Sequence, residues 1–281
     1  MDKLFFWNPY HNGDIIFTRP LVRAVLDRHD VEITWGCFCN HKYLIQDLPV
    51  RVLTDPRDDR LAQDLTYLCP FDHFPINTWI GQYPETRRCI WSSFVGAYNR
   101  QVEARGLAHL AIVSRLVPMV DFPDVDLVIN ENSVYVSNSV SRSGQSDYVM
   151  NMQALSMEFP ALTFYCTANP GWNAPNMVDC SKLNLVQLSA ISNRCDAIIG
   201  KAGGAIDCAF TEINRFKPRA IMGLSDPHNP TIWNYPGLRV SYLQAHEQLK
   251  RFLQEVMSRS KPRLPNAPVK GWHPPGSFRP G

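Results

Sequence analysis

The chain has 281 residues, 45% of them hydrophobic and 19% charged, and its formal net charge at pH 7 is +2. This composition is typical of a globular protein with a hydrophobic core, and the length suggests two domains of ordinary size. The small net charge argues against nucleic acid as a partner, and no apolar run is long enough to cross a bilayer. Because the first residues lack the layout of a signal peptide, we expect a cytoplasmic protein.

The first half of the chain alternates strands and helices. A strand at residues 4–7 is followed by a polar turn at 8–12, a helix that opens at Gly13-Asp14, and a strand at 31–35. Strand, glycine-containing turn, helix and strand in this order form the βαβ unit of a parallel sheet. The later elements of this half are predicted to be strands at 50–53, 65–68 and 76–80 and a helix at 93–116.

Residues 117–126 hold two prolines and three acids without a clear period, which is typical of a linker. The second half then repeats the alternation, with strands predicted at 133–137, 162–166, 176–180, 196–199 and 219–222 and helices at 148–159, 185–194 and 243–258. Residues 261–281 are rich in Pro and Gly and form a tail. We therefore predict an α/β protein of two Rossmann-like domains, residues 1–125 and 126–260, with a cleft between them.

The eight cysteines are scattered mostly through apolar segments and predict buried thiols and no disulfide framework. Cys37 and Cys39 form a C-x-C pair two residues before His41, and in a strand all three side chains would share one face. No second Cys/His pair with zinc spacing follows. We expect no metal site and no bound cofactor.

The most informative segment is the glycine turn, residues 200–204, inside the run DAIIGKAGGAIDCAF at 196–210. A predicted strand enters it, and a helical segment starts at once. Glycines let backbone N–H groups approach a ligand closely, and a helix N-terminus attracts anions, so the expected ligand is a phosphate or diphosphate. The turn is neither a Walker loop nor a full dinucleotide fingerprint, and a plain strand-to-helix connection is the alternative interpretation.

Three segments resemble the heptosyltransferase family of GT-B glycosyltransferases. Gly13-Asp14-Ile-Ile-Phe-Thr-Arg-Pro20-Leu-Val-Arg-Ala looks like that family's opening Gly-Asp-hydrophobic-Thr-x-Pro-x-Leu-x-Ala, and residues 196–209 are similar to its strand and turn before a donor-facing helix. Residues 223–230, GLSDPHNP, resemble its Gly-Pro-Thr-Asp-Pro stretch. Where the family has Asn-Asp-Ser/Thr-Gly-Pro-Met-His, this chain has KAGGAID at 201–207, so recognition of one particular sugar does not carry over.

The resemblance implies that the second domain binds a nucleotide-diphosphate sugar and the first binds a glycan or other hydroxyl acceptor. It places the general base at Asp14, with His11 as the alternative, although Asp14 also fits a plain N-terminal helix acid. The leaving diphosphate would be stabilised without a metal by the amides of Gly203 and Gly204 together with Lys201.

Further donor-side candidates come from the loop after the strand at 133–137, from the helix expected after the glycine turn, which would extend to Glu212, and from the turn after the strand at 219–222. They are the loop residues Arg142, Ser143 and Gly144, the acid Glu212 near a ribose, and the turn residues Asp226 and His228. Each also fits an ordinary surface position or turn. Two other functions stay open: a nucleotide-sugar epimerase of the same architecture, and a non-catalytic nucleotide- or glycan-binding protein. Contact with a membrane is expected only through a lipid-linked acceptor.

Overall fold

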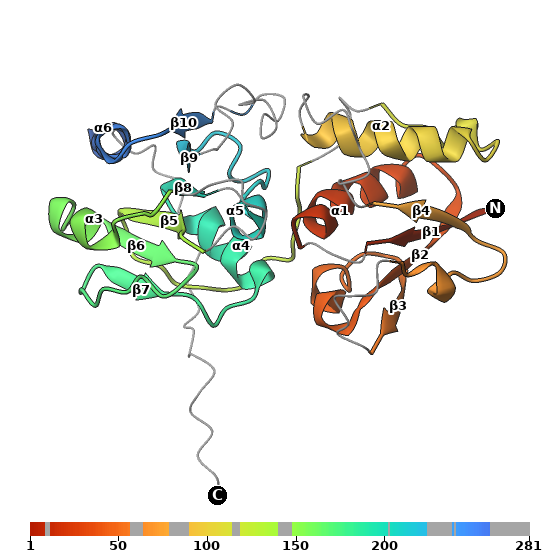
Figure 1. The fold of residues 1–281 in the computed structure, drawn as a ribbon, viewed down its shortest axis with the longest axis horizontal. Coiled ribbons are helices and arrows are strands. Elements are labelled where there is room, and N and C mark those ends of the chain that lie inside the picture. The colour runs from red at the N-terminus through yellow and green to blue at the C-terminus, as the bar shows by residue number, and fades with distance from the viewer. Residues whose placement is uncertain are drawn as a thin grey trace, which may run out of the picture.

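The computed structural model describes residues 1–8, 12–56, 64–78, 90–113, 119–139, 148–201, 203–223, 238 and 240–258. These residues form two parallel β-sheets, each packed against helices, and the two α/β units lie side by side (Figure 1). The predicted α/β class with parallel sheets is confirmed. In the described part of the chain, no helix has the length and apolar character needed to cross a membrane.

The first sheet has the strand order β3-β2-β1-β4, with every neighbouring pair parallel. Its strands are β1 (Asp2–Trp7), β2 (Val31–Phe38), β3 (Arg51–Asp55) and β4 (Phe74–Asn77). Successive side chains of β1 face opposite sides: Leu4 and Phe6 join the main core under α1 (Asn12–Leu26) and α2 (Ile90–Glu103). Phe5 and Trp7 pack instead with Leu65. A strand that is buried on both faces reads as a continuous apolar run, as β1 does.

The second sheet has the order β10-β9-β8-β5-β6-β7, again parallel throughout. Its strands are β5 (Ser133–Ser137), β6 (Thr163–Cys166), β7 (Met177–Asp179), β8 (Ala197–Lys201), β9 (Arg219–Met222) and β10 (Ser241–Leu243). Counted from β5, this is the 3-2-1-4-5-6 order of a doubly wound Rossmann sheet. The chain therefore carries a complete Rossmann topology in its second half.

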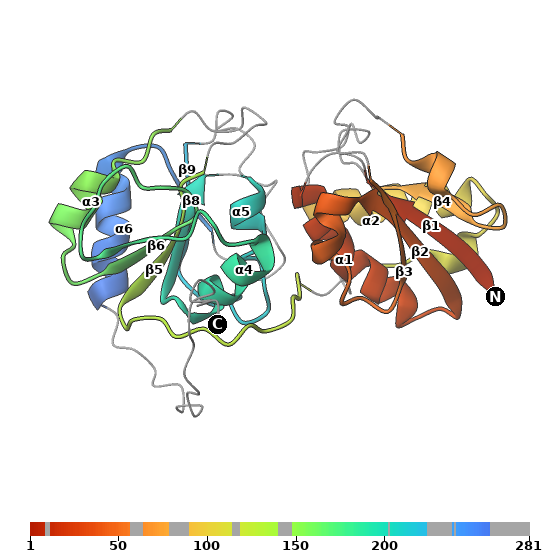
Figure 2. The ribbon, with the colours of Figure 1, turned by 90° about the horizontal axis from the view of Figure 1, so that it is seen from below.

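Helices cover both faces of the second sheet (Figure 2). They are α3 (Met152–Glu158), α4 (Leu185–Arg194), α5 (Gly204–Asp207) and α6 (His246–Ser258). Val134 and Val136 pack with Leu249 of α6, whereas Tyr135 joins the cluster that contains Leu188 of α4. The helices α4 and α5 lie on the face of this sheet that is turned toward α1 of the first unit (Figure 2).

One hydrophobic core runs through both units where α1 contacts α5. The rings of Phe17 and Phe210 meet edge to face with centroids 6.1 Å apart, and both belong to the same buried cluster. The segment that connects the two units is bound to the second one, because Val120 N–H donates to the Phe210 carbonyl at 3.0 Å. The buried guanidinium of Arg19 bonds to both carboxylate oxygens of Asp47 at 2.7 Å. The Phe17–Phe210 and Val120–Phe210 contacts hold the first unit and the connecting segment against the second unit, while the Arg19–Asp47 pair holds α1 within the first unit.

Several predicted elements differ from the observed ones. Residues 65–68, predicted as a strand, contain a 3-10 turn, η2 (Thr66–Leu68). The helix predicted at 93–116 is α2, which ends at Glu103 and is followed by a second short turn, η4 (Ala108–Leu110). Gly106 ends α2 with a φ of 75°, a backbone conformation that glycine adopts without strain.

The sheet continues one strand beyond β9, the last strand predicted from the sequence, because β10 pairs with the outer edge of β9. The strand β10 is only three residues long and half exposed, and it therefore gives little hydrophobic signal. By contrast, α4 has the predicted bounds. Its start is specified locally, since the Asn184 side chain accepts from Gln187 N–H and the Gln187 side chain accepts from Asn184 N–H, both at 3.0 Å.

Candidate functional site

The strand order locates where each sheet would bind a ligand. In an open parallel sheet, ligands bind beyond the carboxyl ends of the strands at the point where the order reverses. This point lies between β1 and β4 in the first sheet and between β5 and β8 in the second. The relevant strand ends are Trp7 and Asn77 in one unit and Ser137 and Lys201 in the other.

The strand ends at the first switch point are held in place by hydrogen bonds. Thr78 donates to the Trp7 carbonyl through its backbone N–H at 3.0 Å and its hydroxyl at 3.1 Å. Gln101 of α2 accepts from Asn77 N–H at 2.8 Å and donates to the Asn77 carbonyl at 2.9 Å. The carboxyl ends of β1 and β4 are therefore tied to each other and to α2.

Asp14 lies in the first turn of α1, directly after this switch point. Asp14 is buried, with 5% of its surface exposed. A carboxylate is stabilised at a helix N-terminus by the free N–H groups and the helix dipole. The alternative base, His11, lies outside the described residues, so the choice between the two stays a prediction.

The glycines of the glycine turn serve different purposes. A Cβ atom at Gly200 would lie 2.4 Å from the Ser137 Cβ, so this glycine lets β5 and β8 pack closely. A Cβ atom at Gly204 would lie 3.4 Å from the Asn12 Cβ, an ordinary contact, so α1 packs closely on the turn here without requiring a glycine. Gly203 has a φ of 152°, and a Cβ there would meet no described atom within 4 Å. Ligand approach, expected for all three glycines, fits Gly203 best.

The helix that follows the glycine turn is shorter than predicted. It is α5, which ends at Asp207 after a single turn and therefore adds little dipole of its own. Glu212, expected on this helix near a ribose, lies beyond it with an exposed side chain. The Glu212 carboxylate forms an ion pair with Arg215 at 2.6 Å. Lys201 is the last residue of β8 and is partly exposed.

The N-termini of α1 and α5 meet at a contact that we call the seam, formed by residues 12–14 and 203–207. A Cβ atom at Gly13 would lie 2.6 Å from Asp207 Oδ2, so the Asp207 carboxyl group packs directly on the backbone of α1. Asp207 is 3% exposed, and its Oδ1 is buried without a hydrogen-bond partner among the described residues. Burial, together with the negative charge of Asp14, raises the pKa of Asp207 well above its usual value.

Asp207 is not among the site residues predicted from the sequence, and it stands where the resembled family motif ends in histidine. The available signal was an acid within the otherwise small and apolar run at 204–210. Acids are rarely buried without a partner, and such positions are often functional. The seam brings Gly204 of the predicted site against Asn12 and Gly13, the residues directly before Asp14.

The remaining predicted site residues lie outside the described residues. They are Arg142, Ser143, Gly144, Asp226 and His228. The first three follow the end of β5 within seven positions, and the last two follow the end of β9 within six. Both segments therefore come after the carboxyl ends of strands of the second sheet, and their roles stay predictions.

The C-x-C pair does not share one face as predicted. β2 ends at Phe38, and a 3-10 helix, η1 (Cys39–Leu44), begins with Cys39, so Cys37 is buried while Cys39 is exposed. Burial raises the pKa of the Cys37 thiol to about 12. In the described ranges, no group of three or more His, Cys, Asp and Glu side chains is arranged to hold a metal ion.

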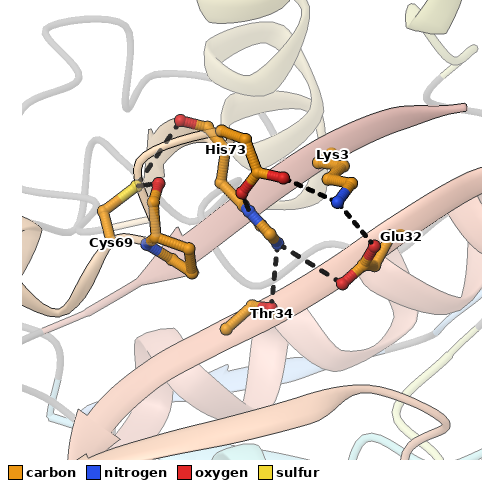
Figure 3. A network of polar contacts seen from close by, with 7 residues as sticks. Lys3, Glu32, Thr34, Cys69 and His73 are labelled. Carbon is orange, nitrogen blue, oxygen red and sulfur yellow. Dashed lines mark hydrogen bonds and ion pairs between the residues drawn. The ribbon is translucent and has the colours of Figure 1, made fainter.

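A second polar cluster lies between β1, β2 and the residues before β4 (Figure 3). His73 contacts Asp72 through Nδ1 at 2.9 Å and Thr34 Oγ1 through Nε2 at 3.1 Å. Lys3 donates to Asp72 at 2.6 Å, and these contacts lower the pKa of Asp72 to about 2. The carboxylate, imidazole and hydroxyl are ordered as in a nucleophilic triad, but the fully buried Thr34 is out of a substrate's reach. We interpret the cluster as structural.

No protein-family model matches the sequence, and no curated protein matches it. Solved structures do match by fold. A glycosyl transferase family 9 protein from Veillonella parvula is 13% identical with a TM-score of 0.57, over 91% of this chain and 92% of that one. The heptosyltransferase WaaC from E. coli, solved with ADP, is 13% identical with a TM-score of 0.52, and the match covers 90% of this chain and 97% of WaaC. The glycotransferase of kitacinnamycin is 11% identical with a TM-score of 0.52, and the match covers 92% of this chain and 91% of that protein. The resemblance to heptosyltransferases is therefore confirmed at the level of the fold.

Proposed function

We propose that the chain is a glycosyltransferase that moves a sugar from a nucleotide-diphosphate donor to a hydroxyl group of a glycan or other acceptor. The observation that carries the proposal is the seam: a buried acid after the first sheet's switch point lies beside the glycine turn after the second sheet's switch point. The likeness in fold to solved glycosyltransferases supports it.

On the donor side, we assign the nucleotide sugar to the carboxyl edge of the second sheet, within a domain of residues 126–260. The backbone amides of Gly203 and Gly204 and the ammonium of Lys201 would face the diphosphate, since β8 ends at that point. Arg142 and the Asp226–His228 turn would complete the contacts from neighbouring strand ends. WaaC was solved with ADP, which makes ADP-sugars the first donors to test.

On the acceptor side, residues 1–125 would bind the acceptor in a cleft facing the donor. The acceptor oxygen attacks the anomeric carbon, its proton passes to the Asp14 carboxylate, and the bond from that carbon to the diphosphate breaks. Negative charge gathers on the leaving diphosphate, where the turn amides and Lys201 would stabilise it without a metal. Asp14 is buried, so an acceptor hydroxyl that reaches it is shielded from bulk water.

The donor site is tested first by thermal shift with UDP, GDP, ADP, CMP and their common sugar conjugates. A ligand at 100 times its dissociation constant adds about 2.7 kcal/mol to the free energy of unfolding, a readily visible shift. No shift with any of them would contradict the donor site. A shift without any later turnover would favour a non-catalytic binding protein.

Catalysis is tested with Asp14→Asn, which keeps the shape of the side chain and removes the base. Release of nucleoside diphosphate in the presence of a glycan acceptor panel should fall about 10²- to 10⁴-fold, while the thermal shift with the donor is kept. Asp30→Asn, at an exposed carboxylate just after α1, is the matched control and should transfer normally. Unchanged transfer by Asp14→Asn would refute its role, and acceptor-independent conversion of the donor would indicate an epimerase.

A further inference from the structure

The seam holds two carboxyl groups contributed by different units of the chain. Asp14 belongs to α1 of the first unit, and Asp207 ends α5 of the second. They act on each other electrostatically, since the charge of Asp14 is one of the two causes that raise the pKa of Asp207. The Asp207 side chain also packs against the backbone of Gly13, directly before Asp14 in the sequence.

The surroundings of Asp207 favour its neutral form. Among the described residues, the titratable groups that act on it are the Asp14 carboxyl from α1 and the Cys208 thiol next to it in the chain. The Cys208 thiol is itself neutral, because burial raises its pKa to about 12. One oxygen of Asp207 lacks a hydrogen-bond partner in this part of the structure. An ionised carboxylate in such a place is costly, and neutralisation by a proton is the usual outcome.

The two positions differ in how well they hold a negative charge. Asp14 lies in the first turn of the 15-residue helix α1, where N–H groups and the dipole stabilise a carboxylate. Asp207 lies at the carboxyl end of its own helical turn, where the dipole opposes a negative charge, and its Oδ1 is buried without a hydrogen-bond partner among the described residues. When two close carboxyl groups share one charge, it therefore belongs on Asp14 and the proton on Asp207.

We propose that Asp14 and Asp207 hold a single proton between them at neutral pH, carried by Asp207, and that Asp207 is a positioning residue for Asp14. The proton state stands on the seam alone, whereas the positioning role rests on the proposed function. During transfer, the Asp14 carboxylate takes the proton of the acceptor hydroxyl and later releases it to water, while the Asp207 proton stays in place. Ionisation of Asp207 would put a second negative charge near the Asp14 carboxylate, in a place where one oxygen of Asp207 has no hydrogen-bond partner among the described residues.

The proton state is tested by measuring stability against pH in the wild type, Asp207→Asn and Asp30→Asn. Asparagine has the shape of a protonated aspartic acid and does not ionise. Above pH 5, the unfolded Asp207 is ionised while the folded one keeps its proton, so the wild type loses stability as pH rises. Relative to Asp207→Asn, its folding equilibrium constant should fall about tenfold per pH unit until Asp207 ionises in the folded state. Asp30→Asn should follow the wild type.

Equal slopes for the wild type and Asp207→Asn would overturn the proposal. If Asp207→Asn fails to fold, the protonation state of Asp207 is measured in the wild type by ¹³C NMR at pH 7, with labelled aspartate carboxyl carbons. One carboxyl resonance in the protonated position supports the proposal, and a spectrum of ionised carboxylates alone overturns it. Where the variant folds, the same resonance should vanish from its spectrum, and persistence of that resonance would overturn the assignment to Asp207.

The positioning role is tested by the pH profile of transfer. With Asp207 neutral, transfer should rise as Asp14 ionises and fall again where Asp207 ionises, giving two limbs. Asp207→Asn should keep the acidic limb and lose the alkaline one, a change that a purely structural role would not produce. An unchanged alkaline limb would overturn the positioning role. If no transfer is found at all, the proposed function fails, and the stability and NMR measurements still decide the proton state.

Discussion

Gly13→Ala tests the geometry of the seam directly. The new methyl carbon would lie 2.6 Å from Asp207 Oδ2, well inside van der Waals contact. The Asp207 side chain has two torsions and is fully enclosed, so its carboxyl group cannot move into solvent. Overpacking of this kind costs about 1–3 kcal/mol, and alanine returns up to about 1 kcal/mol through its higher helix propensity. The net expectation is a loss of about 1–2 kcal/mol in the free energy of unfolding.

Thermal and urea denaturation measure this loss, and the expected fall in Tm is about 2–8 °C. Gly96→Ala is the matched control, because a Cβ atom there would lie 3.7 Å from its nearest neighbour, the Arg100 Nη1 atom. With ordinary contacts inside α2, that substitution should stabilise the protein by about 0.5–1 kcal/mol. If Gly13→Ala proves as stable as Gly96→Ala, then the Asp207 carboxyl does not lie against α1 and the reasoning about the seam is wrong.

Two further predictions concern the cations Arg19 and Lys217. Arg19→Met removes a guanidinium that pairs with Asp47 and lies 4.3 Å from the centre of the Phe122 ring. The free energy of unfolding should fall by about 2–3 kcal/mol, because Asp47 is only partly solvated and loses its partner. Arg23→Met, which removes a half-exposed cation 3.6 Å from the same carboxylate, should cost less than about 1 kcal/mol, and a reversed order in urea denaturation would contradict this account. Burial lowers the pKa of Lys217 from 10.5 to about 8, so between these values the unfolded chain binds more protons and stability should rise with pH. Lys217→Met should lack this rise, and a parallel curve for the variant would show that another group causes it.

The sequence predicted elements well where the signals were local. The capping box of Asn184 and Gln187 specifies the start of α4, and the apolar run of β1 marks a strand buried on both faces. The sequence did not predict the elements whose formation depends on contacts with neighbouring elements. The three residues of β10 form a strand only because β9 offers them an edge. The seam could not be predicted for the same reason, since the burial of Asp207 depends on α1, almost two hundred residues earlier in the chain.

The structure also changes which residues carry the case for sugar transfer. The glycine turn has the composition of a phosphate loop, but Gly200 is required by packing against Ser137, whereas a Cβ atom at Gly204 would make only ordinary contacts with Asn12. Packing thus accounts for one of the three glycines, and the spacing alone is weak evidence for an anion. The evidence for a functional role of Asp14 is stronger. An acid that only caps a helix is expected in solvent, whereas Asp14 is buried beside α5 of the other unit. The decisive variants therefore lie at Asp14 and Asp207 rather than at the glycines.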